Sequence, residues 1–476
     1  MFHSIKHIPM NEIMNNAAIT PENSLVAHLC RLSQRPISSQ TRERLAQAFL
    51  DWFTAGWSGA GATSAETYRR VAWDCHPGAG AAPVFGGAGM NANGAAFANA
   101  AIAHIREIDD AHRAAMLHPG VVSVTPVLAM AASRGMTQRQ VADAVIAGYE
   151  VSLRLGEALG TRHAAGFHAT ATAGAVGAAA AAGVAMGLTP ALLHHALGIG
   201  ATQAAGLWQL VDDDAHESKS LHPAFAVRNG MAAAYAARAG LPGAQRFATG
   251  SRGLYRLLGG DGPLGALDGG LEAPARVNTA TIKAWPCCAQ LFTPLDATRE
   301  LMDLHAPALD EIESVDVEIF THALKIAGVE WPAKPAETCF SLRYVVARLL
   351  LAGKLGIEDM ESPDLHAPGL LALARRITVR TSEVFQQEFP RLRPCRVTLT
   401  LKDGRQWSAL RKLRKGDPED PYTWASLQTR MRAFAPAMDD AAARAIVAWC
   451  ERFTDAGRDA RVCLPAPELF GAAPHS

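Results

Sequence analysis

Residues 93–259 are the stretch that most constrains the fold, because they are rich in alanine and glycine and nearly every segment favours a helix. Turn-forming residues interrupt the stretch at Gly120, Gly135, Gly160 and residues 187–190 and 240–243. No strand-like alternation occurs between these breaks. Helices with small side chains approach one another closely, since the ridges of one surface fit the shallow grooves of the next. The stretch therefore predicts a compact helical bundle.

The pattern changes after about residue 278. Three segments alternate apolar and polar residues as half-buried strands do, namely residues 312–320, 377–381 and 395–402. An Asp-Gly pair, Asp403-Gly404, follows the third segment and predicts a hairpin with residues 406–412. Helical runs separate the strands at residues 341–353 and 365–376. A second, smaller domain of the α+β class is expected.

Two further stretches precede the bundle. Residues 24–61 have apolar residues at helical spacing, and a break with a possible cap at residues 36–39 predicts two helices there. Residues 71–93 are rich in glycine and proline, which predicts a loop. A glycine-rich phosphate cradle would need a strand before it and a helix after it, and we expect no phosphate site because that context is absent.

The overall composition excludes several classes of protein. The chain of 476 residues exceeds one ordinary domain, and its 45 basic and 45 acidic residues argue against binding nucleic acid or a membrane surface through bulk charge. Its eight cysteines form no Cys-x-x-Cys pair. The start of the chain lacks the pattern of a secretory signal, and the most apolar stretch, residues 170–188, has too much alanine and glycine for a membrane span. We expect a cytoplasmic protein with reduced thiols.

Residues 107–120 concentrate polar groups at the junction of two apolar helices. Asp109, Asp110, His112 and His118 all lie in this segment, which ends in the helix-breaking pair Pro119-Gly120. Charged groups in such a place need partners, because their desolvation is costly. Two interpretations stay open from the residue types alone: a capped helix end with a surface histidine, or the wall of a polar pocket.

Four motifs follow one another along the chain. They are Asn99, His104, Asp109-Asp110 and His118-Pro119-Gly120; GFHATATAG at residues 166–174; SKSLHP at residues 218–223; and KAWPCC at residues 283–288. Together with residues 340–344 and 416–421, these motifs resemble the signature of the MmgE/PrpD family, which includes 2-methylcitrate dehydratases, cis-aconitate decarboxylases and iminodisuccinate epimerases. The resemblance extends over nearly the whole chain, and its motifs occur in the family's order.

The resemblance implies an arrangement of domains. In that family the last helices return to the helical domain, so that the α+β part is an insertion that acts as a lid. We therefore expect a mainly α fold: a large all-helical domain in residues 1–278 and 415–476, and a smaller α+β lid domain in residues 279–414. Family members also look like homodimers formed through the helical domain, and the alanine-rich helices offer more apolar surface than one bundle hides, so we expect a homodimer.

The family's reactions share one chemical demand. A proton is removed or added at a carbon next to a carboxylate, which requires an acid/base pair and fixed cations for the carboxylates of the substrate. His118 and His168 each lie beside a turn-forming or small residue, and we expect them to be the acid/base pair. Asp109 is expected to complete the catalytic group by orienting a histidine. On a helix its neighbour Asp110 would face another direction, since adjacent residues there differ by about 100°.

Two lysines are the expected cations. Lys219 lies at the start of a buried helix and needs an anionic partner, which the residues leave open between the substrate and Asp109 or Asp110. Lys283 lies at the junction with the lid, where closure would bring it over the substrate and exclude water.

Four further residues are expected to line the substrate site: Asp110, Thr170, His222 and Cys288. The reaction needs no thiol chemistry, so Cys288 is expected to line the pocket only. His112, His118, Asp109 and Asp110 match no helical His-x-x-x-His spacing, and the resembled family works without a metal or an iron–sulfur cluster. We expect no metal and no cofactor.

Three positions depart from the family's pattern. Ala111 stands where threonine is common, Glu107 where aspartate is common, and Phe292 where histidine is common. A polar group of the usual pocket is missing at Phe292, which affects the identity of the substrate more than the class of reaction.

The leading hypothesis is a cofactor-independent lyase of the 2-methylcitrate dehydratase type, which eliminates water from a small di- or tricarboxylic acid. A cis-aconitate-type decarboxylase and an iminodisuccinate-type epimerase are the alternatives within the family. The alternative outside enzymes is a homodimer that binds carboxylates without catalysis, because Ala111 and Phe292 replace polar residues.

Overall fold

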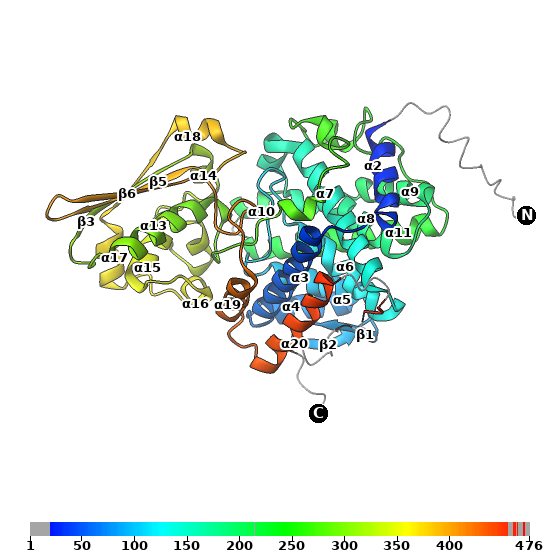
Figure 1. Ribbon diagram of the computed structural model, residues 1–476, viewed down its shortest axis with the longest axis horizontal. Helices are drawn as coiled ribbons and strands as arrows, with labels where there is room; N and C mark the ends of the chain where they lie inside the picture. The colour runs from blue at the N-terminus through cyan, green and yellow to red at the C-terminus, as the bar shows by residue number, and fades with distance from the viewer. Residues whose placement is uncertain (1–19, 214, 456–459, 463, 465–469, 472–476) are drawn as a thin grey trace, which may run out of the picture.

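The structure is a computed structural model that describes residues 20–213, 215–455, 460–462, 464 and 470–471. Its buried apolar side chains form two separate clusters. The larger comes almost entirely from residues before 283 and after 426, and the smaller from residues 287–409. Figure 1 shows the corresponding parts side by side, one helical and the other containing a sheet. The expected mainly α fold with a smaller α+β part is confirmed, whereas the division at residues 278/279 and 414/415 stays a prediction that the two clusters favour.

The helical part is built from helices that begin at side-chain caps in several places. The longer ones are α2 (Pro21–Arg31), α3 (Ser39–Ala60), α4 (Ala65–Cys75), α5 (Ala92–His104), α6 (Pro119–Arg134), α7 (Gln138–Gly166), α8 (Ala169–Ala185), α9 (Pro190–Thr202) and α11 (Leu221–Arg238). The side chain of Ser38 accepts a hydrogen bond from the amide of Thr41 and starts α3, as the break at residues 36–39 predicts. Thr137 and Gln140 form a capping box at the start of α7.

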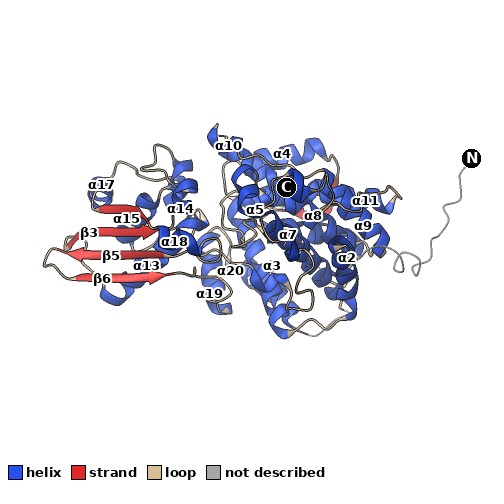
Figure 2. Cartoon of the chain, turned by 90° about the horizontal axis from the view of Figure 1, so that it is seen from above, coloured by secondary structure: helices blue, strands red, loops and turns tan. Residues whose placement is uncertain are grey.

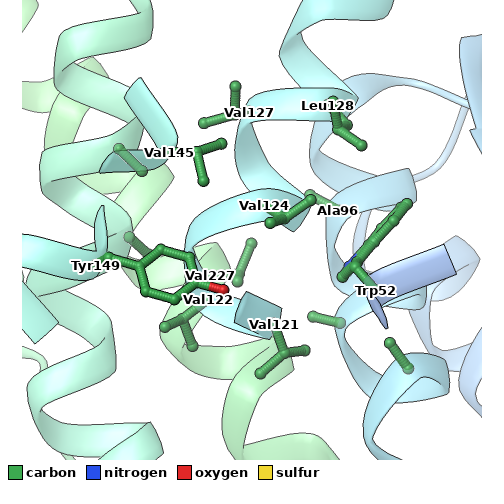
Figure 3. Close-up of a cluster of buried hydrophobic side chains, with 14 of the residues drawn as sticks. Trp52, Ala96, Val121, Val122, Val124, Val127, Leu128, Val145, Tyr149 and Val227 are labelled. Carbon is green, nitrogen blue, oxygen red and sulfur yellow. The ribbon is translucent and has the colours of Figure 1, made fainter. Parts of the chain in front are cut away.

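Helix α8 lies at the centre of the bundle, because its small side chains let α6, α7, α9 and α11 approach its backbone. A Cβ added to Gly177 of α8 would lie 2.7 Å from Cβ of Ser152 in α7, and one added to Gly230 of α11 would lie 2.6 Å from Cβ of Ala178. Both distances are below van der Waals contact, so only glycine permits this packing. The valines of α6, such as Val122 and Val124, fill the adjoining core in Figure 3.

The expectation of a loop at residues 71–93 is wrong. Helix α4 continues to Cys75, and an antiparallel hairpin follows, with strands β1 (Ala79–Val84) and β2 (Gly87–Met90). Gly86 makes the turn with a φ of 65°, and a Cβ on Gly80 would lie 2.5 Å from the carbonyl oxygen of Met90. The glycines therefore mark a turn and a close approach of two strands, because small residues let the backbones of neighbouring strands come close together.

The α+β part contains a mixed sheet of strands β3 (Ile312–Ile319), β4 (Ile377–Thr381), β5 (Cys395–Leu401) and β6 (Gln406–Arg411), in the order β4-β3-β5-β6. Strand β4 is parallel to β3, and the other pairs are antiparallel. Val315, Val317 and Ile319 of β3 alternate toward the buried side of the sheet. Helix α13 (Phe292–His305) packs against β5 and β6, and α15 (Leu342–Ala352) packs against β4 (Figure 2). Gly404, with a φ of 87°, lies in the turn of the expected β5–β6 hairpin. The predicted strands are all present.

Shorter elements complete the two parts. They are α10 (Gln209–Asp212), α12 (Leu254–Leu257), α14 (Thr321–Ile326), α16 (Ile357–Glu361), α17 (Pro368–Ala374) and α18 (Glu383–Glu388). In the described parts of the chain, no helix combines the length and the apolar character that crossing a bilayer requires.

The chain returns to the helical part after the sheet. Helices α19 (Trp424–Phe434) and α20 (Asp440–Glu451) pack against α3, beside which they lie in Figure 1. The ring of Phe49 in α3 contacts Trp449 and Phe453, with centroids 5.2 and 4.5 Å apart. This return is what the resemblance implies, and it makes the sheet-containing part an insertion.

Several contacts tie the insertion to the helical part. The guanidinium of Arg106, just after α5, binds both carboxylate oxygens of Glu361 in α16 at 2.6 and 2.7 Å. Ile357 at the start of α16 belongs to the larger apolar cluster. The residues between α5 and α6 therefore lie where the two parts meet.

Candidate active site

The segment between α5 and α6 is extended and held by backbone pairing. Ala111 and Thr281 exchange hydrogen bonds, with their amide nitrogens 2.9 and 2.7 Å from the opposite oxygens. Glu107 has a φ of 57°, a left-handed conformation that is uncommon outside glycine. The segment is not helical, so Asp109 and Asp110 are not related by the rotation of about 100° expected of neighbours on a helix. Their side chains nevertheless point to different surroundings.

Asp109 binds two histidines at once. Its Oδ2 lies 2.8 Å from Nδ1 of His104 and 3.3 Å from Nδ1 of His118. Burial raises the pKa of Asp109, but His104 and His118 and their hydrogen bonds outweigh burial and hold the pKa well below its ordinary value. The carboxylate is therefore ionised and can orient both imidazoles.

The contacts of His118 determine its tautomer. Its Nδ1 lies 2.9 Å from the main-chain oxygen of Asp110, and a carbonyl oxygen can only accept. Nδ1 therefore carries the hydrogen, and Nε2 has the free lone pair when the ring is neutral. Burial is the main cause that lowers the pKa of His118 to about 4, against the opposing effect of Asp109. At neutral pH this imidazole is an unprotonated base.

His168 lies in the same cluster, at the start of α8. Its Nδ1 is 3.1 Å from Nδ1 of His222, and the ring of Trp208 lies 4.6 Å away between centroids. Burial and then Lys219 lower the pKa of His168, and the same two causes lower that of His222 to about 4. Both rings are neutral, so one donates to the other. Thr170 supports His118, because the Thr170 hydroxyl accepts a hydrogen bond from the amide of His118 at 3.1 Å.

The two lysines converge on a carboxylate that the sequence did not single out as a site residue. Lys219 is paired with Oε1 of Glu107, and Lys283 lies 3.5 Å from Oε2. Burial raises the pKa of Glu107, but Lys219, His104 and Lys283 outweigh it and lower the pKa far below its ordinary value. The partner of Lys219 is therefore Glu107, and neither Asp109 nor Asp110.

His104 is the second residue that the sequence argument left out of the site. It is fully buried, and its Nε2 lies 2.9 Å from Nζ of Lys219. Its place in the first motif, five residues before Asp109, was a usable signal. For Glu107 the departure from the family's aspartate was the corresponding signal.

Asp110 faces away from the histidines. Its Oδ1 accepts a hydrogen bond from the amide of Gly120 and its Oδ2 one from the hydroxyl of Tyr149, both at 2.7 Å. Burial and then Asp51 raise the pKa of Asp110 to about 8. The carboxyl thus retains a proton near neutral pH, and its two bonds fix the start of α6. The structure brings Asp109 to the cluster and not the side chain of Asp110.

Cys288, Phe292 and His112 were also singled out from the sequence. Cys288 is half-buried, and burial followed by the nearby Glu107 raises the pKa of its thiol, so it stays protonated. Phe292 is fully buried in the apolar cluster of the α+β part. His112 bonds to Thr279 and to the amide of Ala115, outside the cluster. Cysteines in the described residues are free thiols.

One group of described side chains has the spacing of metal ligands. Ring nitrogens of His104, His118 and His168 lie within 4.8 Å of one another. Nε2 of His104 already accepts a hydrogen bond from the Lys219 ammonium, and a second cation there would be repelled. The Lys219 ammonium beside these rings suits a carboxylate ligand better than a metal ion.

The fold and the cluster together define a class: mainly α proteins with an inserted α+β part and a buried set of histidines, lysines and carboxylates where the two meet. Family profiles match both parts, the MmgE/PrpD N-terminal domain over residues 23–266 and the MmgE/PrpD C-terminal domain over residues 285–452. The chain belongs to the MmgE/PrpD family.

Two similar proteins are named cis-aconitate decarboxylase, and a third is named as decarboxylase-like. The chain is 29% identical over 404 residues to a cis-aconitate decarboxylase of Aspergillus terreus, covering 78% of this chain and 81% of that protein. A cis-aconitate decarboxylase from strain NIH 2624 of the same species is 28% identical over 418 residues, covering 80% and 84%. The cis-aconitate decarboxylase-like protein oryM of Aspergillus oryzae is 28% identical over 228 residues, covering 45% and 47%.

Proposed function

We propose that this protein is a lyase that acts on a small di- or tricarboxylic acid by acid/base chemistry at a carbon next to a carboxylate. The observation that carries the proposal is the convergence of Lys219 and Lys283 on the Glu107 carboxylate, beside Nε2 of His118. A place that holds one carboxylate between two ammonium groups suits the carboxylate of a substrate. Glu107 offsets one of the two positive charges when no substrate is bound.

The histidines then act in proton transfer. Nε2 of His118 lies 3.9 Å from Oε2 of Glu107 and has a free lone pair, so it can take a proton from a substrate carbon or, once protonated, return one. His168, 5.9 Å from His118 between ring centroids, is the second acid/base group. Asp109 orients the His118 ring and stabilises its protonated form.

Two reactions use the same groups. In decarboxylation, a carbon–carbon bond breaks, carbon dioxide leaves, and the electron pair stays on a carbon conjugated with a remaining carboxylate until a histidine protonates it. In dehydration, a histidine removes the proton next to a carboxylate while an acid protonates the leaving hydroxyl. The lysines stabilise the negative charge that develops in both. The names of the relatives favour decarboxylation of a cis-aconitate-type acid. The motifs also fit dehydration of a 2-methylcitrate-type acid and epimerisation of an iminodisuccinate-type acid.

A panel of polycarboxylic acids tests the proposal. The purified protein is incubated with cis-aconitate, 2-methylcitrate, citrate and iminodisuccinate, and products are identified by chiral chromatography followed by mass spectrometry. Loss of carbon dioxide, loss of water and unchanged mass with inverted stereochemistry distinguish the three reactions. Calorimetric binding of these acids without any product would favour the carboxylate-binding protein instead, and neither binding nor turnover would refute the lyase proposal.

We further propose a homodimer formed through the helical part, and a cytoplasmic location. Exposed apolar side chains on that part, among them Leu207, Leu241 and Leu257, support self-association. Light scattering at micromolar concentration is expected to give twice the mass of one chain, and a monomer would contradict it.

A further inference from the structure

Arg430 is a buried arginine in α19, remote in sequence from every motif of the site. Its side chain is 5% exposed. Each of its three nitrogens has a different partner. Nε donates to the main-chain oxygen of Lys283 at 2.5 Å, Nη2 donates to that of Ile108 at 2.6 Å, and Nη1 lies 2.9 Å from Oδ1 of Asp51.

The first two bonds join the two segments that supply the catalytic groups. Ile108 lies between Glu107 and Asp109, and Lys283 extends its ammonium back to the main-chain oxygen of Glu107 at 2.5 Å. One guanidinium therefore sets the distance between the backbone that carries Lys283 and the backbone that carries the carboxylates. Its planar fork allows this, because the donors point in fixed, separate directions.

The third contact leads to His118. Asp51 of α3 is 2% exposed, and its Oδ2 accepts a hydrogen bond from the amide of Asp110 at 2.8 Å. The main-chain oxygen of the same residue, Asp110, accepts from Nδ1 of His118 at 2.9 Å. An ion pair with Asp51 and two hydrogen bonds through the main chain of Asp110 thus link Arg430 to the His118 imidazole.

The geometry points to Arg430 as a positioning residue that holds Lys283 and His118 in register with each other. The expected effect of Arg430 on catalysis rests on the proposed function. Its role in positioning Lys283 and His118 does not. Because the guanidinium comes from a helix that follows the α+β insertion, the site is completed only when the end of the chain has packed against α3.

Arg430→Lys is the discriminating variant. Lysine retains the positive charge next to Asp51, which keeps the buried carboxylate paired, but one ammonium cannot reproduce bonds in three fixed directions. We expect the folded variant to lose about tenfold to a hundredfold in kcat, since a displacement of about 1 Å at reacting groups has that effect. Arg432→Lys is the matched control, because Arg432 lies on the same helix and pairs with Asp440 at the surface.

A measurement that needs no substrate separates this inference from the proposed function. The protein is labelled with ¹⁵N-histidine, and His118→Gln assigns the Nδ1–H resonance of His118. We expect Arg430→Lys to shift this resonance while Arg432→Lys leaves it in place. Asp51→Asn should also shift it, and serves if Arg430→Lys does not fold.

The outcomes are distinct. If Arg430→Lys shifts the His118 resonance but the wild-type protein turns over no polycarboxylate, the positioning role is supported and the lyase is refuted. An unshifted resonance and unchanged kcat in folded Arg430→Lys would overturn the positioning role, whatever the wild-type activity.

Discussion

Nζ of Lys219 lies 2.9 Å from Nε2 of His104, the imidazole whose Nδ1 is bound by Asp109 at 2.8 Å. Because an ammonium only donates, Nε2 accepts and Nδ1 carries the hydrogen toward the carboxylate. Asp109, His104 and Lys219 therefore form a chain that orients the ammonium before any substrate is present. Such preorganisation avoids the cost of ordering a long side chain when the substrate binds.

Lys219→Ala is expected to weaken both substrate binding and turnover. A cation that holds a carboxylate acts in the ground state and in the transition state, so KM should rise and kcat should fall. A hydrogen bond between charged groups contributes about 1.5–3 kcal/mol, which corresponds to roughly a tenfold to hundredfold loss in kcat/KM. Steady-state kinetics on the confirmed substrate measure it, with the exposed Lys354→Ala as control. Near-normal kinetics would remove Lys219 from the site.

His118→Ala is expected to lower kcat by about a hundredfold to ten-thousandfold with the fold intact, which is the usual contribution of a positioned proton-transfer group. Circular dichroism and the unfolding temperature check the fold. The matched control is His366→Ala, an exposed histidine of the α+β part. If both variants were equally active, proton transfer would have to occur elsewhere.

Acid is expected to destabilise the protein through its neutral buried histidines. The pKa of His118 and that of His222 are lowered to about 4 in the folded state, mainly by burial, from an ordinary 6.5. Between these values the unfolded chain binds more protons, so the free energy of unfolding decreases as pH falls from about 6.5 to about 4. Urea unfolding at pH 7 and pH 5 measures the decrease. The double variant His118→Gln/His222→Gln should show a smaller decrease, and an equal one would contradict the assignment.

Asp110→Asn is expected to be most stabilising at high pH. The folded pKa of Asp110 is raised to about 8, by burial and then by Asp51, from an ordinary 3.8. Over that range the folded state binds more protons than the unfolded state, so the contribution of this group to stability decreases as pH rises. Asparagine stays neutral and can still accept from the Gly120 amide. Thermal unfolding at pH 5 and pH 9 should show a smaller pH dependence than wild type, unlike the exposed control Asp310→Asn.

Glu107→Asp is expected to shift the preference toward larger acids. The change draws the carboxylate back by one methylene from Lys219 and Lys283 and restores the residue that the family commonly has. The space gained should raise kcat/KM for a tricarboxylate relative to a dicarboxylate by about tenfold, within the usual effect of one methylene. Competition between the two acids measures the ratio directly. An unchanged ratio, as expected for the exposed Glu217→Asp nearby, would show that Glu107 does not limit the size of the substrate.

Local patterns predicted most of the elements correctly. The alternation in residues 312–320 and 395–402 corresponds to β3 and β5, and the Asp-Gly pair to the turn before β6. These predictions succeed because the period of a strand or helix is written in neighbouring residues. The hairpin of β1 and β2 was missed, since its alanines and glycines show no contrast between buried and exposed faces.

The site was predicted less completely, because the direction of a side chain depends on contacts with distant segments. The motifs identified His118, His168, Lys219, Lys283 and Asp109, which the structure brings together, while their catalytic roles stay predictions. The same motifs also placed Asp110 in the substrate site. Pairing of Ala111 with Thr281 and the bonds from Tyr149 and Gly120 turn the Asp110 carboxyl away.

Composition and periodicity are properties of short stretches, and they specified a helical bundle with a smaller α+β part. The partners of buried charges depend instead on which distant segments meet. Glu107 acquires its role between Lys219 and Lys283 only because three segments converge around it, and Arg430 reaches Lys283 and Ile108 only after α19 has packed against α3. Desolvation makes each such pairing obligatory once the chain is folded, but no local pattern states which pairing will occur.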